Sequence, residues 1–263
     1  MNSCSQNSGT APDDEEQQQS SSSPLKCLSL LKPLDFSRRA EKLPEVYGQW
    51  RAEQRASAGR IERQLRTRRA LDDLIDAQLA RFDAHYNHSP LLLRPRDVAR
   101  LLDPPWNPPL ANAALSWLGD WRPSAILSLA RILSSFSPPS SSLSSLSPRA
   151  HRTLAEAIRR LKVQEAVLDQ QVEEWQVMAS VKMASGKGVA EELAKMEEMV
   201  ARSQKLRYKA LELAVKWVLD RNQAAEFLVA FAGVQDLAHR HAERWRARVG
   251  PVSVAVQACL PAY

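Results

Sequence analysis

The chain has 263 residues, 44% of them hydrophobic and 25% charged, which suits one large domain or two small ones around a hydrophobic core. It contains only eight glycines, whereas alanine, leucine, glutamate, glutamine and arginine abound. This composition favours helices and disfavours glycine-built nucleotide-binding folds. The net charge of +6 permits contact with nucleic acid or an anionic membrane but requires neither.

Residues 1–34 are predicted to be a disordered, low-complexity tail, because their serine- and glutamine-rich first part cannot bury enough apolar surface to fold. The three cysteines, Cys4, Cys27 and Cys259, fall in the expected tails. No disulfide framework is therefore expected, and a reducing intracellular compartment is favoured. The sequence shows neither a secretory signal nor an apolar run long enough to cross a membrane.

Residues 45–86 carry the first helical pattern, with a break expected near Gly59 and with Tyr47 and Trp50 anchoring the start. The apolar positions that share one face are Ile61, Leu65, Leu71, Leu74, Ile75, Leu79, Phe82 and Tyr86.

Prolines shape the next region. They bound a short helix at about 96–102 and a second one that starts near Leu110 and runs through Trp117 to Gly119, where a left-handed stop is expected. Pro123 suits the first turn of a third helix that reaches about Phe136. The segment 134–147, rich in serine and proline, is predicted to be a mobile loop.

The clearest periodicity comes after Pro148. Leu154, Ile158, Leu161, Leu168, Val172, Trp175 and Ala179 recur at steps of three and four, and Glu165 interrupts the stripe. After a turn at 185–188, a helix over 189–219 is predicted to point Leu193, Met196, Val200, Leu206, Ala210, Leu213 and Trp217 inward. Asp220 is predicted to cap the last helix, and 249–263 to form a tail. The predicted fold is all-α, a single bundle over 45–248.

The sequence contains only weak signals for a catalytic or metal-binding site. The glycines around Lys187 lack the spacing of a phosphate-binding loop, so a helix–helix turn is the better interpretation. His239 and His241 are two residues apart and so point to different sides of a helix, while His85 and His88 lie at a helix end. These four histidines are expected to be ordinary surface or hydrogen-bonded residues, and metal or haem binding is the alternative interpretation. Without a nucleophile motif, the sequence predicts no enzyme and no cofactor.

The clustered arginines and the clustered tryptophans each allow two interpretations. The arginines over 51–69 and 240–248 could contact phosphates, but interleaved acids and the absence of a basic leucine zipper favour solvated faces over DNA binding. Trp106, Trp117 and Trp121 lie within sixteen residues. They predict a packed junction or, if exposed, a partner-binding hot spot. Arg122 is expected to pair with Asp120 or to cap helix carbonyls.

Several motifs together resemble the plant delay-of-germination (seed dormancy) domain family. They are Tyr47-Gly48-Gln49-Trp50, Pro105-Trp106, the stretch from Trp117 to Ser124, and the block from Leu219 to Leu228. The stretch 117–124 is the most specific match, although Asp120 stands where the family has a glycine. The resemblance implies structural or partner-binding roles for Tyr47, Trp50, Trp106, Trp117, Gly119, Arg122, Pro123, Ser124, Gln223 and Phe227.

The resemblance also implies function. The family is helical and non-enzymatic, and divergence from the dormancy group indicates its pollen-aperture (inaperturate-pollen) branch. In that branch the protein is expected to mark plasma-membrane domains that escape exine deposition, acting in the cytoplasm and at the inner face of the membrane. The alternative is a dormancy-type regulator, in the nucleus or cytosol, that binds a phosphatase or a transcription partner. In both cases the expected partners are other proteins, with an anionic membrane surface as a further candidate.

Overall fold

The computed structural model describes residues 42–67, 71–88, 100–185 and 188–250, and regular structure in these ranges is helical, as predicted. The α-helices are α2 (Lys42–Thr67), α3 (Asp72–Tyr86), α5 (Pro109–Leu115), α6 (Pro123–Phe136), α7 (Pro148–Ala184), α8 (Val189–Glu212) and α9 (Arg221–Val249). A 3-10 turn, η3 (Ser142–Ser145), and a π-helical segment, η4 (Leu213–Val218), complete them. The predicted N-terminal tail and nearly all of the C-terminal one lie outside the described residues.

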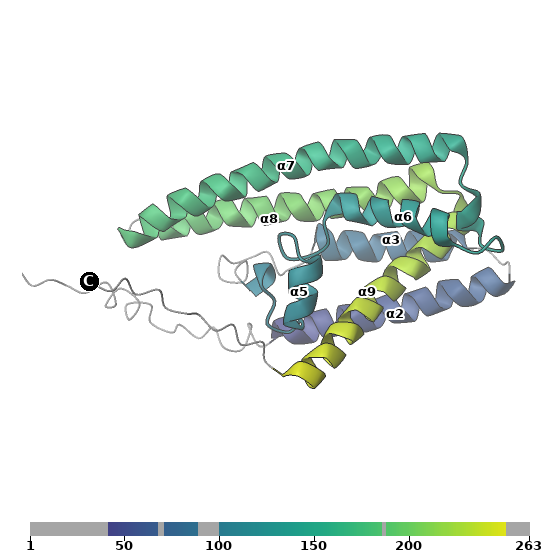
Figure 1. Ribbon diagram of the computed structural model, residues 1–263, viewed down its shortest axis with the longest axis horizontal. Coiled ribbons are helices and arrows are strands. Elements are labelled where there is room, and N and C mark those ends of the chain that lie inside the picture. The colour runs from purple at the N-terminus through teal and green to yellow at the C-terminus, as the bar shows by residue number, and fades with distance from the viewer. Residues whose placement is uncertain (1–41, 68–70, 89–99, 186–187, 251–263) are drawn as a thin grey trace, which may run out of the picture. The chain divides into compact units, whose positions relative to one another are not determined.

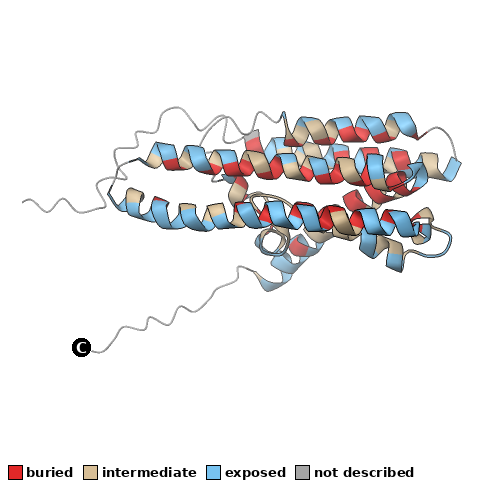
Figure 2. Ribbon diagram, turned by 90° about the horizontal axis from the view of Figure 1, so that it is seen from above, coloured by how far each residue is buried: buried red, intermediate tan, exposed pale blue. Residues whose placement is uncertain are grey.

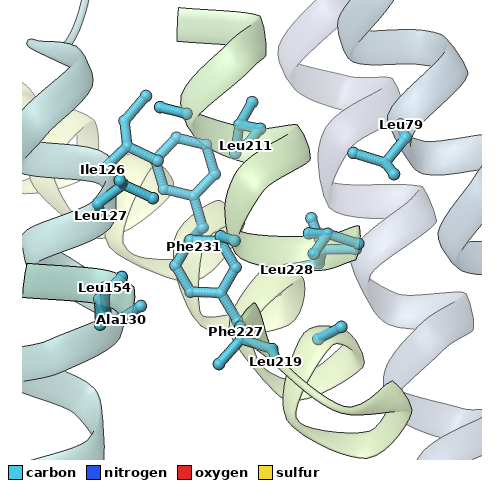
Figure 3. Packing of buried hydrophobic residues seen from close by; sticks show 14 of the residues in the cluster. Leu79, Ile126, Leu127, Ala130, Leu154, Leu211, Leu219, Phe227, Leu228 and Phe231 are labelled. Atoms are coloured by element: carbon cyan, nitrogen blue, oxygen red, sulfur yellow. The ribbon is translucent and has the colours of Figure 1, made fainter. Parts of the chain in front are cut away.

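Helices α7 and α8 run side by side as a long hairpin, and α6 packs against both (Figure 1). Residues 186 and 187 of the turn predicted at 185–188 lie outside the described residues. Helix α9 crosses α2, with α5 beside it, while α3 contacts α8 and α9. The core forms where these layers meet: Phe227 and Phe231 of α9 lie among Ile126 and Leu127 of α6 and Leu211 of α8 (Figure 3). The α7–α8 hairpin keeps a long exposed outer surface (Figure 2).

Two predicted boundaries were wrong. Gly59 lies inside α2, which continues to Thr67, because one glycine in a helix costs only about 1 kcal/mol and the flanking apolar face is buried. Helix α5 ends at Leu115, so Trp117 and Gly119 belong to a turn and not to a helix end. Helix α6, in contrast, begins at Pro123 and ends at Phe136, as predicted.

The serine- and proline-rich segment is packed, where a mobile loop was predicted. Leu143 and Leu146 enter the core. The Glu226 carboxylate of α9 accepts hydrogen bonds from Ser141 Oγ at 2.6 Å and from the Leu143 backbone N–H at 3.1 Å. Two leucines three residues apart among the serines thus supply buried anchors, which a count of loop-forming residues overlooks.

Trp217 is 73% exposed, although its spacing predicted an inward position. The cause is η4, where the Leu219 N–H donates to the Ala214 carbonyl five residues earlier, at 3.0 Å. A π-helical turn adds a residue to the usual repeat and so rotates the side chains out of register. Beyond it, Asp220 caps α9 as predicted: its side chain accepts from the Gln223 N–H, and Gln223 accepts from the Asp220 N–H.

Candidate functional site

The most specific motif forms a tight turn between α5 and α6, which we call the signature turn (residues 117–124). The Trp117 N–H donates to the Asp120 carbonyl at 2.7 Å, and Leu118 and Gly119 have φ values of +48° and +93°. A Cβ on residue 119 would lie 2.6 Å from the Leu101 carbonyl oxygen. Only glycine fits there, because both the backbone angle and the close approach exclude a side chain.

Arg207 of α8 holds this turn from inside. Its side chain is fully buried, and its guanidinium donates to the carbonyls of Trp121 at 2.7 Å, of Leu118 and Asp120 at 3.2 Å each, and of Trp117. Further bonds go to Ser203 Oγ and Gln204 Oε1. Burial lowers the pKa of Arg207, and the nearby Asp120 carboxylate opposes that shift. The charge is therefore neutralised mainly by carbonyl dipoles of the turn.

Trp117 and Arg122 meet Asp169 of α7. The indole Nε1 of Trp117 donates to Asp169 Oδ1 at 2.7 Å, and Arg122 Nη1 donates to Asp169 Oδ2 at 3.0 Å. The Arg122 guanidinium also lies over the Trp117 ring, 4.9 Å from its centroid. Arg122 thus pairs with neither of its expected partners. The Asp120 carboxylate instead accepts hydrogen bonds from the Tyr86 hydroxyl, at 3.1 Å, and from the Trp121 N–H.

Glu165, the residue that interrupts the apolar stripe of α7, caps the start of α6. It is 1% exposed, and its carboxylate accepts from the Ser124 N–H at 2.6 Å and from Ser124 Oγ at 2.8 Å. Pro123 occupies the first turn of α6, where a backbone N–H is not needed. A carboxylate at a helix N-terminus also interacts favourably with the helix dipole.

Tyr47 and Trp50 of α2 belong to an aromatic cluster beside the turn. Trp50 stacks on the ring of His85 at 3.9 Å, and Tyr47 lies 5.1 Å from the ring of Trp106. Burial lowers the pKa of His85 to about 4, so the histidine is neutral at physiological pH. Tyr86 connects this cluster to the turn through Asp120.

The remaining two motif residues lie apart from the turn. Gln223 completes the α9 cap and donates to the Ser142 carbonyl at 3.3 Å. Phe227 stacks on Phe231, whose ring lies 5.6 Å from that of Trp121, so it reaches the turn only through the core. The structure therefore gathers Tyr47, Trp50, Trp106, Trp117, Gly119, Arg122, Pro123 and Ser124 around one junction.

Sequence reasoning missed the three charged residues that hold this junction: Arg207, Asp169 and Glu165. Only Glu165 left a signal, as a break in an apolar stripe. Two of the four histidines singled out in the sequence have a carboxylate neighbour. His239 Nε2 lies 2.9 Å from Glu243 Oε1, and His88 Nε2 lies 3.5 Å from Asp83 Oδ2. Within the described ranges, no three or more of His, Cys, Asp and Glu gather in a position to hold a metal ion.

Comparison with known families points to the same region. The family model described as DOG1: Seed dormancy control matches residues 50–131, from Trp50 in α2 to α6. This segment is similar to the seed dormancy control family. It covers about a third of the chain and contains the whole signature turn, whereas Glu165, Asp169 and Arg207 lie beyond it. The family is a generally non-catalytic, regulatory one. No curated protein matches the chain, and none of the described helices is long and apolar enough to span a membrane.

Proposed function

We propose that this chain is a non-catalytic regulatory module that acts by binding another protein. The seed dormancy control match supports the regulatory class. Around the signature turn, the charged groups pair with one another, with ring faces or with backbone carbonyls. Trp117 is only 9% exposed. This supports a structural role for the turn, so that the partner binds elsewhere.

The observation that carries the proposal is an exposed apolar stripe along α7, which we call the α7 stripe. It consists of Val163, Val167, Gln170, Glu174, Val177 and Val181, which recur at alternating steps of four and three residues. All six are exposed, and the valines are exposed by 66%, 45%, 66% and 64% in chain order. The apolar seam that faces α8 lies on the opposite side of the same helix.

Alternating steps of four and three are the spacing with which one helix packs along another. Four exposed valines on one helix face therefore favour a partner that presents an amphipathic helix. The centre of the stripe is polar: Gln170 Nε2 donates to Glu174 Oε1 at 2.9 Å. A polar pair inside an apolar seam selects the partner and the register more than it adds affinity.

The dormancy role and the pollen-aperture role share this mode of action and differ in where the protein works. A dormancy-type regulator would use the stripe on a phosphatase or a transcription partner in the seed. An aperture factor would use it at the cell cortex, where the net charge of +6 also suits the anionic inner leaflet. A functional, fluorescently tagged chain in seeds and anthers separates the two: spots at the microspore membrane indicate the aperture role, and nuclear or cytosolic signal in seeds indicates the dormancy role.

The mechanism itself is tested by capture from seed and anther extracts, with the tagged full chain as bait. We expect a phosphatase, a transcription factor or a cortical protein to be recovered by the wild type. The double variant Val167→Lys, Val177→Lys should lose it, because it places two charges in the seam.

A matched control adds the same two lysines to the same helix away from the stripe, at the exposed positions Gln176 and Ser180. This control should bind like the wild type, and both variants should melt like it. Equal recovery by the stripe variant, or equal loss in both variants, would contradict the proposal.

A further inference from the structure

A cavity of about 110 Å³ lies between α2, α5, α9 and the signature turn. The residues that line it include the aromatic Trp50 and Trp121 and the nitrogen-bearing side chains of Arg51, Gln54 and His239. Two of these lining residues, Arg51 and Gln54, each carry a buried donor, Arg51 Nη1 and Gln54 Nε2, that has no hydrogen-bond partner among the described residues. Buried donors of this kind are rare in folded proteins, since each one left unpaired costs about 1–3 kcal/mol.

The direction of the Gln54 amide is set by a relay of hydrogen bonds. The Arg81 guanidinium can only donate, and it donates to Gln78 Oε1 at 2.9 Å. Gln78 must therefore turn its amide nitrogen to Gln54, whose Oε1 accepts that bond. Gln54 lines the cavity, is 4% exposed, and is left with its Nε2 as a donor without a partner among the described residues. A flipped Gln54 amide would set two donors against each other.

Arg51 lies three residues before Gln54, on the same face of α2. Burial lowers the pKa of its guanidinium, with the nearby Arg55 adding to the shift and the Glu243 and Asp236 carboxylates opposing it. No ion pair to Arg51 forms within the described part of the chain at salt-bridge distance. The cavity thus holds a cation whose charge is only partly compensated.

The carboxylates around the cavity are already paired. Asp236 binds Arg55 at 3.0 Å and Arg240 at 2.8 Å. Asp120 accepts from Tyr86 and from the Trp121 N–H. Both acids therefore already have hydrogen-bond partners other than Arg51. What the Arg51 guanidinium lacks is a negatively charged hydrogen-bond acceptor.

We propose that this cavity binds a small oxyanion, a carboxylate or phosphate group, through the free donors of Arg51 and Gln54. Arginine presents donors that match the oxygens of both groups, and the Gln54 amide adds a neutral donor one helical turn away. The volume suits a compact group and not a long chain. This inference stands apart from the proposed partner binding, because it concerns a different face and is measured on the purified chain alone.

Isothermal titration calorimetry on the full chain, in a chloride buffer of low ionic strength, tests the site with two probes: sodium phosphate and sodium benzoate. We expect one equivalent of at least one probe to bind. Arg51→Gln removes the charge, and Gln54→Glu keeps the bond from Gln78 but replaces the free donor by an acceptor. Each change should weaken binding at least tenfold. Phosphate binding alone identifies a phosphate site, and benzoate binding alone identifies a carboxylate site.

Arg60→Gln is the matched control, since it removes one positive charge from an exposed position on the same helix. It should bind the probe like the wild type, and all variants should keep the helical circular dichroism signal. Absence of heat with both probes would overturn the proposal. So would an equal loss in Arg60→Gln, because the binding would then reflect general charge and not the cavity.

Discussion

Arg207→Met gives the sharpest test of how the signature turn is built. Methionine is unbranched and apolar, replaces the arginine side chain as far as Nε, and has no donors, so the change removes the four hydrogen bonds from Arg207 to carbonyls of the turn. Two of the four carbonyls retain a partner, because Trp117 and Asp120 also bond to each other's N–H groups. The Leu118 and Trp121 carbonyls lose the only partner that the described residues give them.

The expected loss in the free energy of unfolding depends mainly on those two carbonyls. Each buried acceptor that loses its partner costs about 1–3 kcal/mol, so the loss is about 2–6 kcal/mol before compensation. Methionine also removes the cost of burying a guanidinium, which offsets part of that loss. We therefore expect the free energy of unfolding to fall by about 2–4 kcal/mol. Arg207→Lys should be nearly as harmful, since one ammonium cannot reach carbonyls that the broad guanidinium fork spans.

Urea denaturation monitored by circular dichroism measures this change. Arg202→Met is the control on the same helix: it removes a single hydrogen bond, from Arg202 to Gln171 at 2.7 Å, and should cost less than about 1 kcal/mol. If Arg207→Met costs no more than the control, the turn does not depend on the buried arginine and the reasoning fails.

Two further predictions concern neighbouring residues. Gly119→Ala should destabilise the fold by at least about 2 kcal/mol in thermal melts, because its Cβ would lie 2.6 Å from the Leu101 oxygen at a φ of +93°. Gly233→Ala in open helical space should instead stabilise by about 0.5–1 kcal/mol, and equal effects would refute the argument. The second prediction is a pH dependence: the pKa of His85 is lowered to about 4, from about 6.5 unfolded, so the unfolded state binds the proton first and stability falls as the pH drops from 6.5 to 4. The loss should reach at most about 3 kcal/mol, and the same acid titration of His85→Gln should show a correspondingly shallower slope; an identical slope would contradict it.

The sequence predicted the parts of the fold that depend on local chemistry. Pro123 fixed the start of α6, and Asp220 with Gln223 formed the predicted cap of α9. Such signals act over a few residues and need no knowledge of the rest of the chain. The crowded tryptophans also predicted a packed junction, and Trp117 is indeed buried.

The parts that failed depend on contacts between distant residues. Trp217 is exposed because a π-helical turn shifts the register, and no residue pattern announces that turn. Arg207 was overlooked because an arginine on an amphipathic helix is normally solvent-exposed. Only the carbonyls of a turn almost 90 residues earlier in the chain make it a buried hub. Asp169 pairs with Trp117 and Arg122 for the same reason.

The most direct test of partner binding is hydrogen–deuterium exchange on the chain alone and in complex with the protein that the capture experiment recovers. We predict added protection along residues 163–181 of α7, with the signature turn unchanged because it is already buried. Added protection confined to residues 117–124, with none along α7, would contradict it and would make the signature turn the partner surface.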